Sequence, residues 1–459
     1  MRASPVSQAL TELPASLPLV ERRAVLPAGF AAGACSAGIK ASGRPDLALI
    51  RTTDGPAAAA AVFTPNAFAA APVRHSQRNL TASSGDPSGR HGWAEVIIST
   101  SGSANAATGP AGDADQEEVG RIAAGATGVA LDHVLHLSTG VIGTRLPLDR
   151  VADGVARVMA ELGTDDARLE AAAVALRTTD SVTKLATTTV ELEAPDGGSQ
   201  RVTVSAIAKG VGMIHPRMAT MLSVILTDAA VDPAVLAGLL RPAAVRTWNQ
   251  LSVDGDTSTN DTVFVLASGR ATTVPVAVDS TAAAALGGAI EAVARDLSRQ
   301  QAADGEGAAT LLTCQVSGAV DDAEARAVAR AVVSSSLVKA AVHGRDPNWG
   351  RIAGAAGNAT LADAAVLSAG GLSADDARDR AGSAARLEPD RLRIAIAGHL
   401  VFDGGAGGPV AFDRAAARAA IDAPELLVRL DLGLGAGTGE AFGCDLTEQY
   451  VIENSEYTT

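Results

Sequence analysis

The chain has 459 residues, of which 47% are apolar and only 3% aromatic, so its cores must be built mainly from Ala, Val, Leu and Ile. Its formal charge of −14 argues against non-specific nucleic-acid binding, because neutralising phosphates requires clustered positive charge. Cys35, Cys314 and Cys444 are scattered without CxxC spacing, which suits a reducing compartment and offers no zinc site.

Residues 1–28 are expected to form a flexible N-terminal extension. They contain Pro5, Pro14 and Pro18, and they lack a basic region followed by an unbroken apolar stretch. No other segment has the roughly 20 apolar residues that a membrane-spanning helix needs. We therefore expect a cytoplasmic protein with neither a membrane nor a nucleic acid as partner.

The N-terminal half combines short apolar runs, turns and helical patterns. In chain order, the pattern predicts strands and turns over 29–73, a surface loop at 75–92, a strand at 96–100 entering a turn at 101–105, helices at 113–128 and 149–177 separated by 136–143, and a hairpin over 187–208 turning at 195–198.

The C-terminal half begins with a buried strand and is richer in helices. The pattern predicts a strand at 221–226, helices at 233–249, 281–303 and 321–342, mainly helical structure at 363–384, and strands at 391–403 and 425–453. This mixture predicts an α/β (mixed α+β) protein in layers.

One segment carries most of the chemical information, Lys209-Gly-Val-Gly-Met-Ile-His-Pro-Arg-Met-Ala-Thr-Met-Leu222. Its glycines and proline form a loop that runs directly into the predicted strand. Thr220 follows Ala219 at this junction and can attack the carbonyl that precedes it. Cleavage there would create an N-terminal threonine whose α-amine, with an ordinary pKa of about 7.7–8.0, serves as the base for its own hydroxyl.

Three further segments could complete such a site. Thr139 and Gly140, in the turn Ser138-Thr-Gly140, offer a hydroxyl and a backbone N–H for an oxyanion hole, although most such turns are only turns. Glu306 lies between two glycines, and a helix cap with a solvated glutamate is its alternative. The run Arg177-Thr-Thr-Asp180 is equally consistent with a helix terminus.

Lysine is scarce, since only Lys40, Lys184, Lys209 and Lys339 occur. A chain that has mostly dispensed with lysine keeps it where a compact ammonium is needed. The alternative is that these lysines are surface residues. We do not apply this alternative to Lys209, because it lies within the glycine loop.

Other motifs carry less weight. The acidic run at 254–261 lacks the glycine and glutamate of an EF-hand loop, so we expect no metal there. Two S-x-x-K matches, at Ser181 and Ser336, have no accompanying partner motifs. The run Arg351-Ile-Ala-Gly354 looks like a coenzyme A pyrophosphate loop, but it does not follow a clear strand.

Taken together, the segments resemble the ornithine acetyltransferase family, the bifunctional glutamate N-acetyltransferases of arginine biosynthesis, from about Gly29 to Thr459. Besides the central motif, the matching runs are Gly38-Ile-Lys40, Ala61-Val-Phe-Thr64, Ser138-Thr-Gly-Val-Ile-Gly143, Thr178-Thr-Asp180, Ser252-Val-Asp-Gly-Asp-Thr-Ser-Thr-Asn-Asp261, Asp304-Gly-Glu-Gly307, Asp346-Pro-Asn-Trp-Gly-Arg351, Gly443-Cys-Asp-Leu-Thr-Glu448 and Asn454-Ser-Glu-Tyr-Thr-Thr459.

The resemblance implies self-cleavage between Ala219 and Thr220, with an α chain over 29–219 and a β chain over 220–459. It implies a layered αββα sandwich completed by 220–310, a smaller α/β domain at 311–440, and a tail at 441–459 that returns to the active site. Two α and two β chains would assemble.

The resemblance also implies residue roles. Thr220 would be the acetyl-carrying nucleophile, with Thr139 and Gly140 as the oxyanion hole. The substrate contacts would be Thr178 or Thr179, Lys209, Thr220, Glu306, Asn454 and Thr459. Acetyl would pass from N-acetylornithine to glutamate without cofactor or metal.

Several alternatives stay open. Acetyl-CoA could be a second donor, and Thr179 is only slightly favoured over Thr178. The same threonine chemistry would also suit an amidohydrolase or aminopeptidase, and an uncleaved relative could simply bind ligand. Arg217, beside the scissile bond, stands where relatives often have a small polar residue, and we assign it no role.

Overall fold

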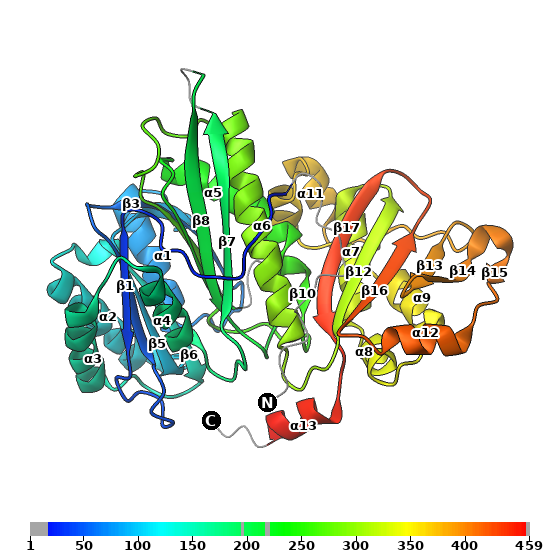
Figure 1. Ribbon diagram of the computed structural model, residues 1–459, viewed down its shortest axis with the longest axis horizontal. Helices are drawn as coiled ribbons and strands as arrows, with labels where there is room; N and C mark the ends of the chain where they lie inside the picture. The colour runs from blue at the N-terminus through cyan, green and yellow to red at the C-terminus, as the bar shows by residue number, and fades with distance from the viewer. Residues whose placement is uncertain (1–16, 194–196, 216–220, 456–459) are drawn as a thin grey trace.

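The computed structural model describes residues 17–193, 197–215 and 221–455. Its larger part contains two stacked sheets (Figure 1). One has the order β1-β2-β5-β6, with strands Phe30–Cys35, Leu47–Thr52, Val96–Ser103 and Val134–Val141. The other has the order β4-β3-β11-β9-β8-β7, with strands His91–Ala94, Ala57–Phe63, Thr262–Ala267, Leu222–Thr227, Ser199–Lys209 and Lys184–Glu193.

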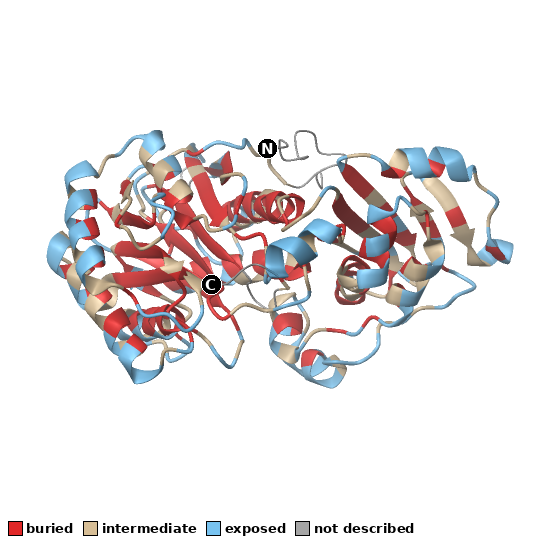
Figure 2. Cartoon of the chain, turned by 90° about the horizontal axis from the view of Figure 1, so that it is seen from below, coloured by how far each residue is buried: buried red, intermediate tan, exposed pale blue. Residues whose placement is uncertain are grey.

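Strict alternation of side chains creates the layers, because successive residues of a strand point to opposite faces. In β11, Phe264 and Leu266 face the core between the sheets, whereas Val263 and Val265 face the outer core. The outer cores are covered by α5 (Pro233–Arg246) and α6 (Thr281–Ala303) on one side. Helices α2 (Gly109–Thr127) and α3 (Leu148–Glu161) cover the other side. The expected αββα sandwich is confirmed, and Figure 2 shows its buried strands between helices with exposed outer faces.

The smaller part is built on a seven-stranded sheet with the order β10-β17-β12-β16-β13-β14-β15. Its strands are Leu251–Ser252, Gly437–Cys444, Leu311–Ala319, Glu425–Asp431, Arg393–Ile396, His399–Asp403 and Gly408–Pro409. Its helices are α7 (Asp322–Ser334), α8 (Ser336–His343), α9 (Trp349–Gly357), α10 (Ala364–Ala369), α11 (Ala374–Arg380) and α12 (Arg414–Ile421). Residue 440, the expected end of the smaller domain, lies within β17.

The surface loop expected at 75–92 is also wrong, since residues 71–84 form helix α1 (Ala71–Ser84). Its polar side chains are buried because the backbone next to and within β6 satisfies them. Ser76 Oγ lies 3.2 Å from the His136 carbonyl oxygen, and Asn79 Nδ2 donates to the carbonyl of Val134 at 2.7 Å. The polarity of this window therefore reflects internal hydrogen bonds.

Two predicted helices are each divided in the structure. The pattern at 149–177 becomes α3 and α4 (Asp166–Leu176), because Gly163 leaves the helix to pair with Ala32. The pattern at 321–342 becomes α7 and α8, because the side chain of Ser335 caps the second helix. The strands expected at 425–453 end at Cys444, and α13 (Glu448–Ser455) follows.

The N-terminal segment from residue 17 onward is not a flexible extension. Glu21 pairs with Thr187 at the edge of the hairpin, and Arg22 bonds to Asp296 on α6 at 2.9 Å. Ala24 and Leu26 are buried in the core between the sheets. Residues 1–16 lie outside the described part of the chain. Among the described helices, none is both long and apolar enough to cross a lipid bilayer.

Candidate active site

Glu306 forms hydrogen bonds with residues from two distant segments. Thr179 Oγ1, just after α4, donates to Glu306 Oε1 at 3.0 Å, and Asn454 Nδ2 on α13 donates to Glu306 Oε2 at the same distance. Lys209, at the end of β8, donates from Nζ to Thr178 Oγ1 at 3.4 Å. The structure therefore brings together Thr178, Thr179, Lys209, Glu306 and Asn454 from the predicted substrate contacts.

The loop that carries Glu306 is held tightly from both sides. The Glu306 N–H donates to the carbonyl of Val211 at 2.8 Å. Gly307 has φ +69°, and a Cβ there would lie 2.3 Å from the backbone nitrogen of Tyr450. Thr447 Oγ1 donates to the Gly307 carbonyl at 2.7 Å. Asp304 does cap α6, as the alternative interpretation expected, but Glu306 is half-buried and both of its carboxylate oxygens accept hydrogen bonds.

A buried lysine links the same segments underneath. Lys184 is fully buried, and its Nζ lies 2.7 Å from Asp180 Oδ1 and 2.6 Å from Asp304 Oδ2. Asp180 Oδ1 also accepts the Gly210 N–H at 2.7 Å. This cluster was missed at the sequence level, although the scarcity of lysine was the signal that could have found it. The surface interpretation is wrong for Lys184 and also for Lys339, whose Nζ donates to the Cys444 carbonyl at 2.7 Å.

The electrostatics of the site depend on burial. Desolvation lowers the pKa of the Lys209 ammonium, while the carboxylates of Asp180 and Asp261 oppose that shift. Lys184, Lys209 and the Gly210 N–H hold the pKa of Asp180 well below its usual range, overcoming its desolvation. Desolvation raises the pKa of Asp261 well above its usual value, and its Oδ2 has no hydrogen-bond partner among the described residues.

Thr139 and Gly140 lie near the end of strand β6, where they pair with Ser101 and Gly102 of β5. Gly140 has φ +126° and pairs with Gly102, and a Cβ on Gly140 would lie 2.4 Å from the Gly102 carbonyl carbon. Asn260 Nδ2 donates to the carbonyl of Ser138 at 2.8 Å and to that of Ala104 at 2.6 Å. Asn260 therefore ties this turn to the start of β11.

The hydroxyl side chains of the early turn are engaged in hydrogen bonds. Ser101 Oγ donates to the Ala175 carbonyl at 2.6 Å, and Ser103 Oγ donates to that of Thr144 at 2.8 Å. The first bond connects the turn to α4, two residues before the Arg177-Thr-Thr-Asp180 run.

Ala219, Thr220, Arg217 and Thr459 lie outside the described residues. Met221, the next residue after Thr220, is fixed: its carbonyl accepts the Thr262 N–H at 2.8 Å, and its side chain packs beside Gly210. Asp254 in the rejected calcium loop instead accepts the backbone N–H groups of Met213 and Ile214.

The chain is similar to known proteins along nearly its whole length. The model of the ArgJ family matches residues 31–459. The arginine biosynthesis bifunctional protein ArgJ of Thermosynechococcus vestitus is 42% identical over 447 residues, covering 94% of this chain and 96% of the relative. The ArgJ protein of Thermus thermophilus is 42% identical over 434 residues, covering 95% and 99%. A solved chain of the ornithine acetyltransferase of Mycobacterium tuberculosis, complexed with ornithine, is 40% identical, with a TM-score of 0.37 and coverage of 43% of this chain and 97% of its own. The chain belongs to the ArgJ family.

Proposed function

We propose that this chain is a self-processing acetyltransferase that moves an acetyl group from N2-acetyl-L-ornithine to L-glutamate through an acetyl ester of Thr220. The observation that carries the proposal is the meeting of Lys209 and Glu306 through the neighbouring hydroxyls of Thr178 and Thr179. N-acetylornithine has one carboxylate and one δ-ammonium, which match a cationic and an anionic anchor.

Processing would create the nucleophile. Thr220 Oγ attacks the Ala219 carbonyl, the peptide nitrogen leaves as the Thr220 α-amine, and water hydrolyses the resulting ester to leave a carboxylate on Ala219. Met221, which follows Thr220 in the sequence, packs beside Gly210, the residue after Lys209.

Acetyl transfer would then take two steps. The α-amine of Thr220 accepts the hydroxyl proton as Oγ attacks the acetyl carbonyl of the donor, and the proton passes to ornithine as it leaves. Thr139 and the Gly140 N–H would stabilise the oxyanion, a contribution of about 3 kcal/mol per donor in comparable sites. The amine of glutamate attacks the acetyl-threonine ester, which releases Thr220 and N-acetylglutamate.

The remaining parts of the proposal rest on the family resemblance. They are the pairing of two α with two β chains, a cytoplasmic location, a contact from Thr459, and the absence of any cofactor or metal requirement. Use of acetyl-CoA as a second donor would make the enzyme bifunctional. Without it, the enzyme would only transfer acetyl groups between amino acids.

Intact-mass measurement tests the processing step. The wild-type protein should give two chains, the second beginning at Thr220, and Thr220→Ala should remain a single inactive chain. Thr220→Ser is the matched control, because a serine keeps the hydroxyl and, after cleavage, the amine. A single-chain wild-type protein that forms acetylglutamate would contradict the proposal.

A second assay tests the reaction itself. With acetylornithine and glutamate both present, acetylglutamate should form faster than free acetate. The amidohydrolase alternative predicts the reverse, because water would then outcompete the amine for the acetyl-threonine ester.

A further inference from the structure

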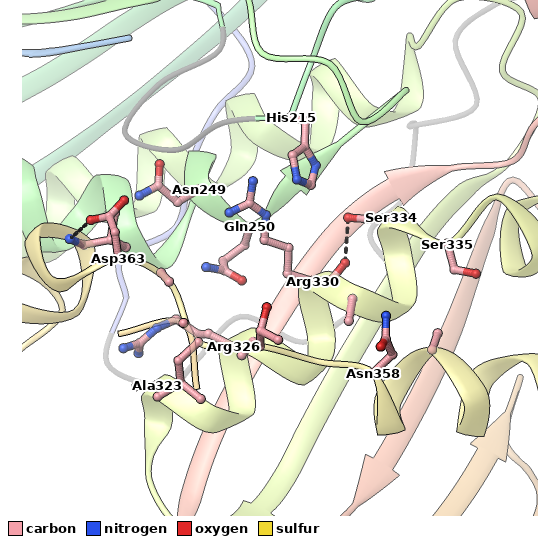
Figure 3. A pocket seen from close by; sticks show the side chains of 18 of the residues that line it. His215, Asn249, Gln250, Ala323, Arg326, Arg330, Ser334, Ser335, Asn358 and Asp363 are labelled. Carbon is pink, nitrogen blue, oxygen red and sulfur yellow. Dashed lines mark hydrogen bonds between the residues drawn. The ribbon is translucent and has the colours of Figure 1, made fainter. Parts of the chain in front are cut away.

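A large cavity lies between the turn that follows α5, in the larger part of the molecule, and helices α7 to α10 of the smaller part (Figure 3). Its volume is about 1250 Å³. None of the described residues that line it is Thr139, Thr178, Lys209, Glu306 or Asn454. It is therefore distinct from the proposed amino-acid site, although His215 on its wall belongs to the same loop as Lys209.

The cavity is cationic on a strongly acidic chain. Three arginines line it, Arg326, Arg330 and Arg351, against the single carboxylate of Asp363 among its described walls. That carboxylate is already engaged, because its Oδ1 accepts the Val366 N–H at 3.0 Å and so caps α10. With a formal charge of −14 on the whole chain, this local excess of positive charge is not a consequence of overall composition.

Arg326 is the most informative of the three. Its side chain leaves α7 and is 93% buried, with a relative exposure of 7%. Its guanidinium makes no hydrogen bond and no ion pair with any other described residue, and desolvation lowers its pKa. Buried guanidinium groups in proteins are normally paired, because desolvation of an unpaired charge is unfavourable.

The carboxylates nearest to Arg326 are committed to other donors. Glu291 pairs with Arg246 at 2.6 Å, and Asp321 pairs with Arg380 at 2.5 Å. Asp322 Oδ1 accepts the Thr438 N–H at 2.8 Å. Arg326 also lines a neighbouring cavity together with Asp322 and Glu291, and these carboxylates attract it without forming a hydrogen bond to its guanidinium.

A second buried group in the wall is also incomplete. Gln250 Nε2 donates to the Val245 carbonyl at 3.1 Å, which fixes the amide, but Gln250 Oε1 has no partner among the described residues. The cavity thus combines an unused cationic donor with an unused acceptor. A ligand with an anionic group and an N–H or O–H group would satisfy both.

Helix α9 contributes another part of the wall. Arg351 is held there by a bond from Nη1 to the Leu337 carbonyl at 2.8 Å. A Cβ on Gly354 would meet no atom within 4 Å, so this glycine leaves open space where the helix meets the cavity. The Arg351-Ile-Ala-Gly354 run, which the proposed reaction does not use, therefore contributes two lining residues.

From these features we propose that the cavity is a second ligand site, which binds a small organic diphosphate. Guanidinium groups form planar, bidentate hydrogen bonds with phosphate oxygens. Three arginines carry more positive charge than the carboxylate of one amino acid can neutralise. A diphosphate has several negative charges and matches them better. The volume is also large enough for a nucleotide-sized ligand.

Calorimetric titration of the processed wild-type protein with ADP, and separately with inorganic pyrophosphate, tests the proposal. We expect one site for each probe, with affinity that weakens as salt rises. Arg326→Gln should weaken binding at least tenfold. Arg378→Gln is the matched control, since Arg378 on α11 is exposed and, among the described residues, forms its ion pair with Asp375. Absence of binding to wild type, or equal binding by Arg326→Gln, would overturn the site.

Thermal unfolding without ligand separates a ligand site from a structural role. Removing an unpaired buried cation should leave Tm unchanged or higher in Arg326→Gln, whereas a structural arginine would lower it. A lower Tm together with unchanged binding would refute the inference. The single-chain Thr220→Ala protein should bind ADP like wild type, so this test does not depend on the proposed reaction.

Kinetics distinguish two sources of the diphosphate. If it is part of an acyl donor, Arg326→Gln should raise the KM for acetyl-CoA and leave that for acetylornithine unchanged. If it is a free nucleotide, ADP should change the rate of acetylornithine-dependent transfer in wild type but not in Arg326→Gln.

Discussion

Lys184 Nζ lies 2.6 Å from Asp304 Oδ2, so an ion pair whose side chains are 0% and 4% exposed joins residues on the two sides of the predicted cleavage position. The same ammonium bonds to Asp180, which in turn accepts the Gly210 N–H. The segments that carry Thr178 and Thr179, Lys209 and Glu306 are thus fixed to one cation. Because this pair is noncovalent, it would keep the α and β chains in register after processing.

Lys184→Met should therefore destabilise the protein strongly. It would leave two buried carboxylates without their cation, and breaking such a pair from one side typically costs about 3–5 kcal/mol. Urea unfolding of the processed protein measures this. Arg121→Met is the control, because the exposed Arg121–Glu117 pair on α2 should contribute less than about 1 kcal/mol. Equal midpoints for the two variants would contradict a central role for Lys184.

The buried histidines should make stability depend on pH. Burial lowers the pKa of His136 to about 3 and that of His75 to about 4. Both folded values lie below the ordinary value of about 6.5, so the unfolded chain binds more protons between pH 6.5 and 4. The stabilisation is complete above pH 6.5 and is lost as pH falls through the folded values. Each histidine should contribute about 1.4 kcal/mol per pH unit to that slope.

Unfolding free energies measured from pH 7 to pH 4.5 would check this dependence. His136→Gln should reduce the number of protons taken up on unfolding by about one, and so lower the slope, whatever its effect on stability at pH 7. An unchanged slope would mean that His136 is already protonated in the folded state.

The regular elements were largely predictable from the sequence, and the exceptions have local causes. Residues 96–100, 187–208 and 281–303 were found because burial on one face or two leaves a periodic apolar signal. Helix α1 was missed because Ser76 and Asn79 make its buried face polar. Helices α3 and α4 were merged because nothing local reveals that Gly163 pairs with Ala32 across 131 positions.

The site divides in the same way. Motifs identified Thr178, Thr179, Lys209, Glu306 and Asn454, which the fold brings together. For the cluster underneath them, the scarcity of lysine pointed only to Lys184, and its pairing with Asp180 and Asp304 is visible only in the folded chain. Whether a charged side chain is buried or exposed depends on tertiary packing, which the local sequence does not show.

Gly140→Ala should damage both the fold and the activity. The added Cβ would lie 2.4 Å from a backbone carbon of Gly102, and φ of +126° is unfavourable for any residue with a Cβ. If Gly140 N–H serves the oxyanion, acetyl transfer should fall by roughly 10²–10³-fold. Gly143→Ala is the matched control, because Gly143 has φ +86° but nothing within 4 Å of its Cβ position. Equal losses in the two variants would attribute the effect to backbone strain alone.

Glu306→Gln tests the anionic anchor directly. The amide keeps the size of the side chain and an oxygen that can accept from Thr179 or Asn454, so the loop should retain its position. It loses the charge that would pair with the δ-ammonium of the donor, and charged hydrogen bonds contribute about 1.5–3 kcal/mol. The KM for acetylornithine should therefore rise roughly 10- to 100-fold. Glu388→Gln, an exposed change in the smaller part that affects only the Arg391 pair, should leave it unchanged. If Glu306→Gln lowers kcat and leaves KM unaltered, Glu306 acts on the reaction itself, and the assignment of this carboxylate as the ammonium anchor is wrong.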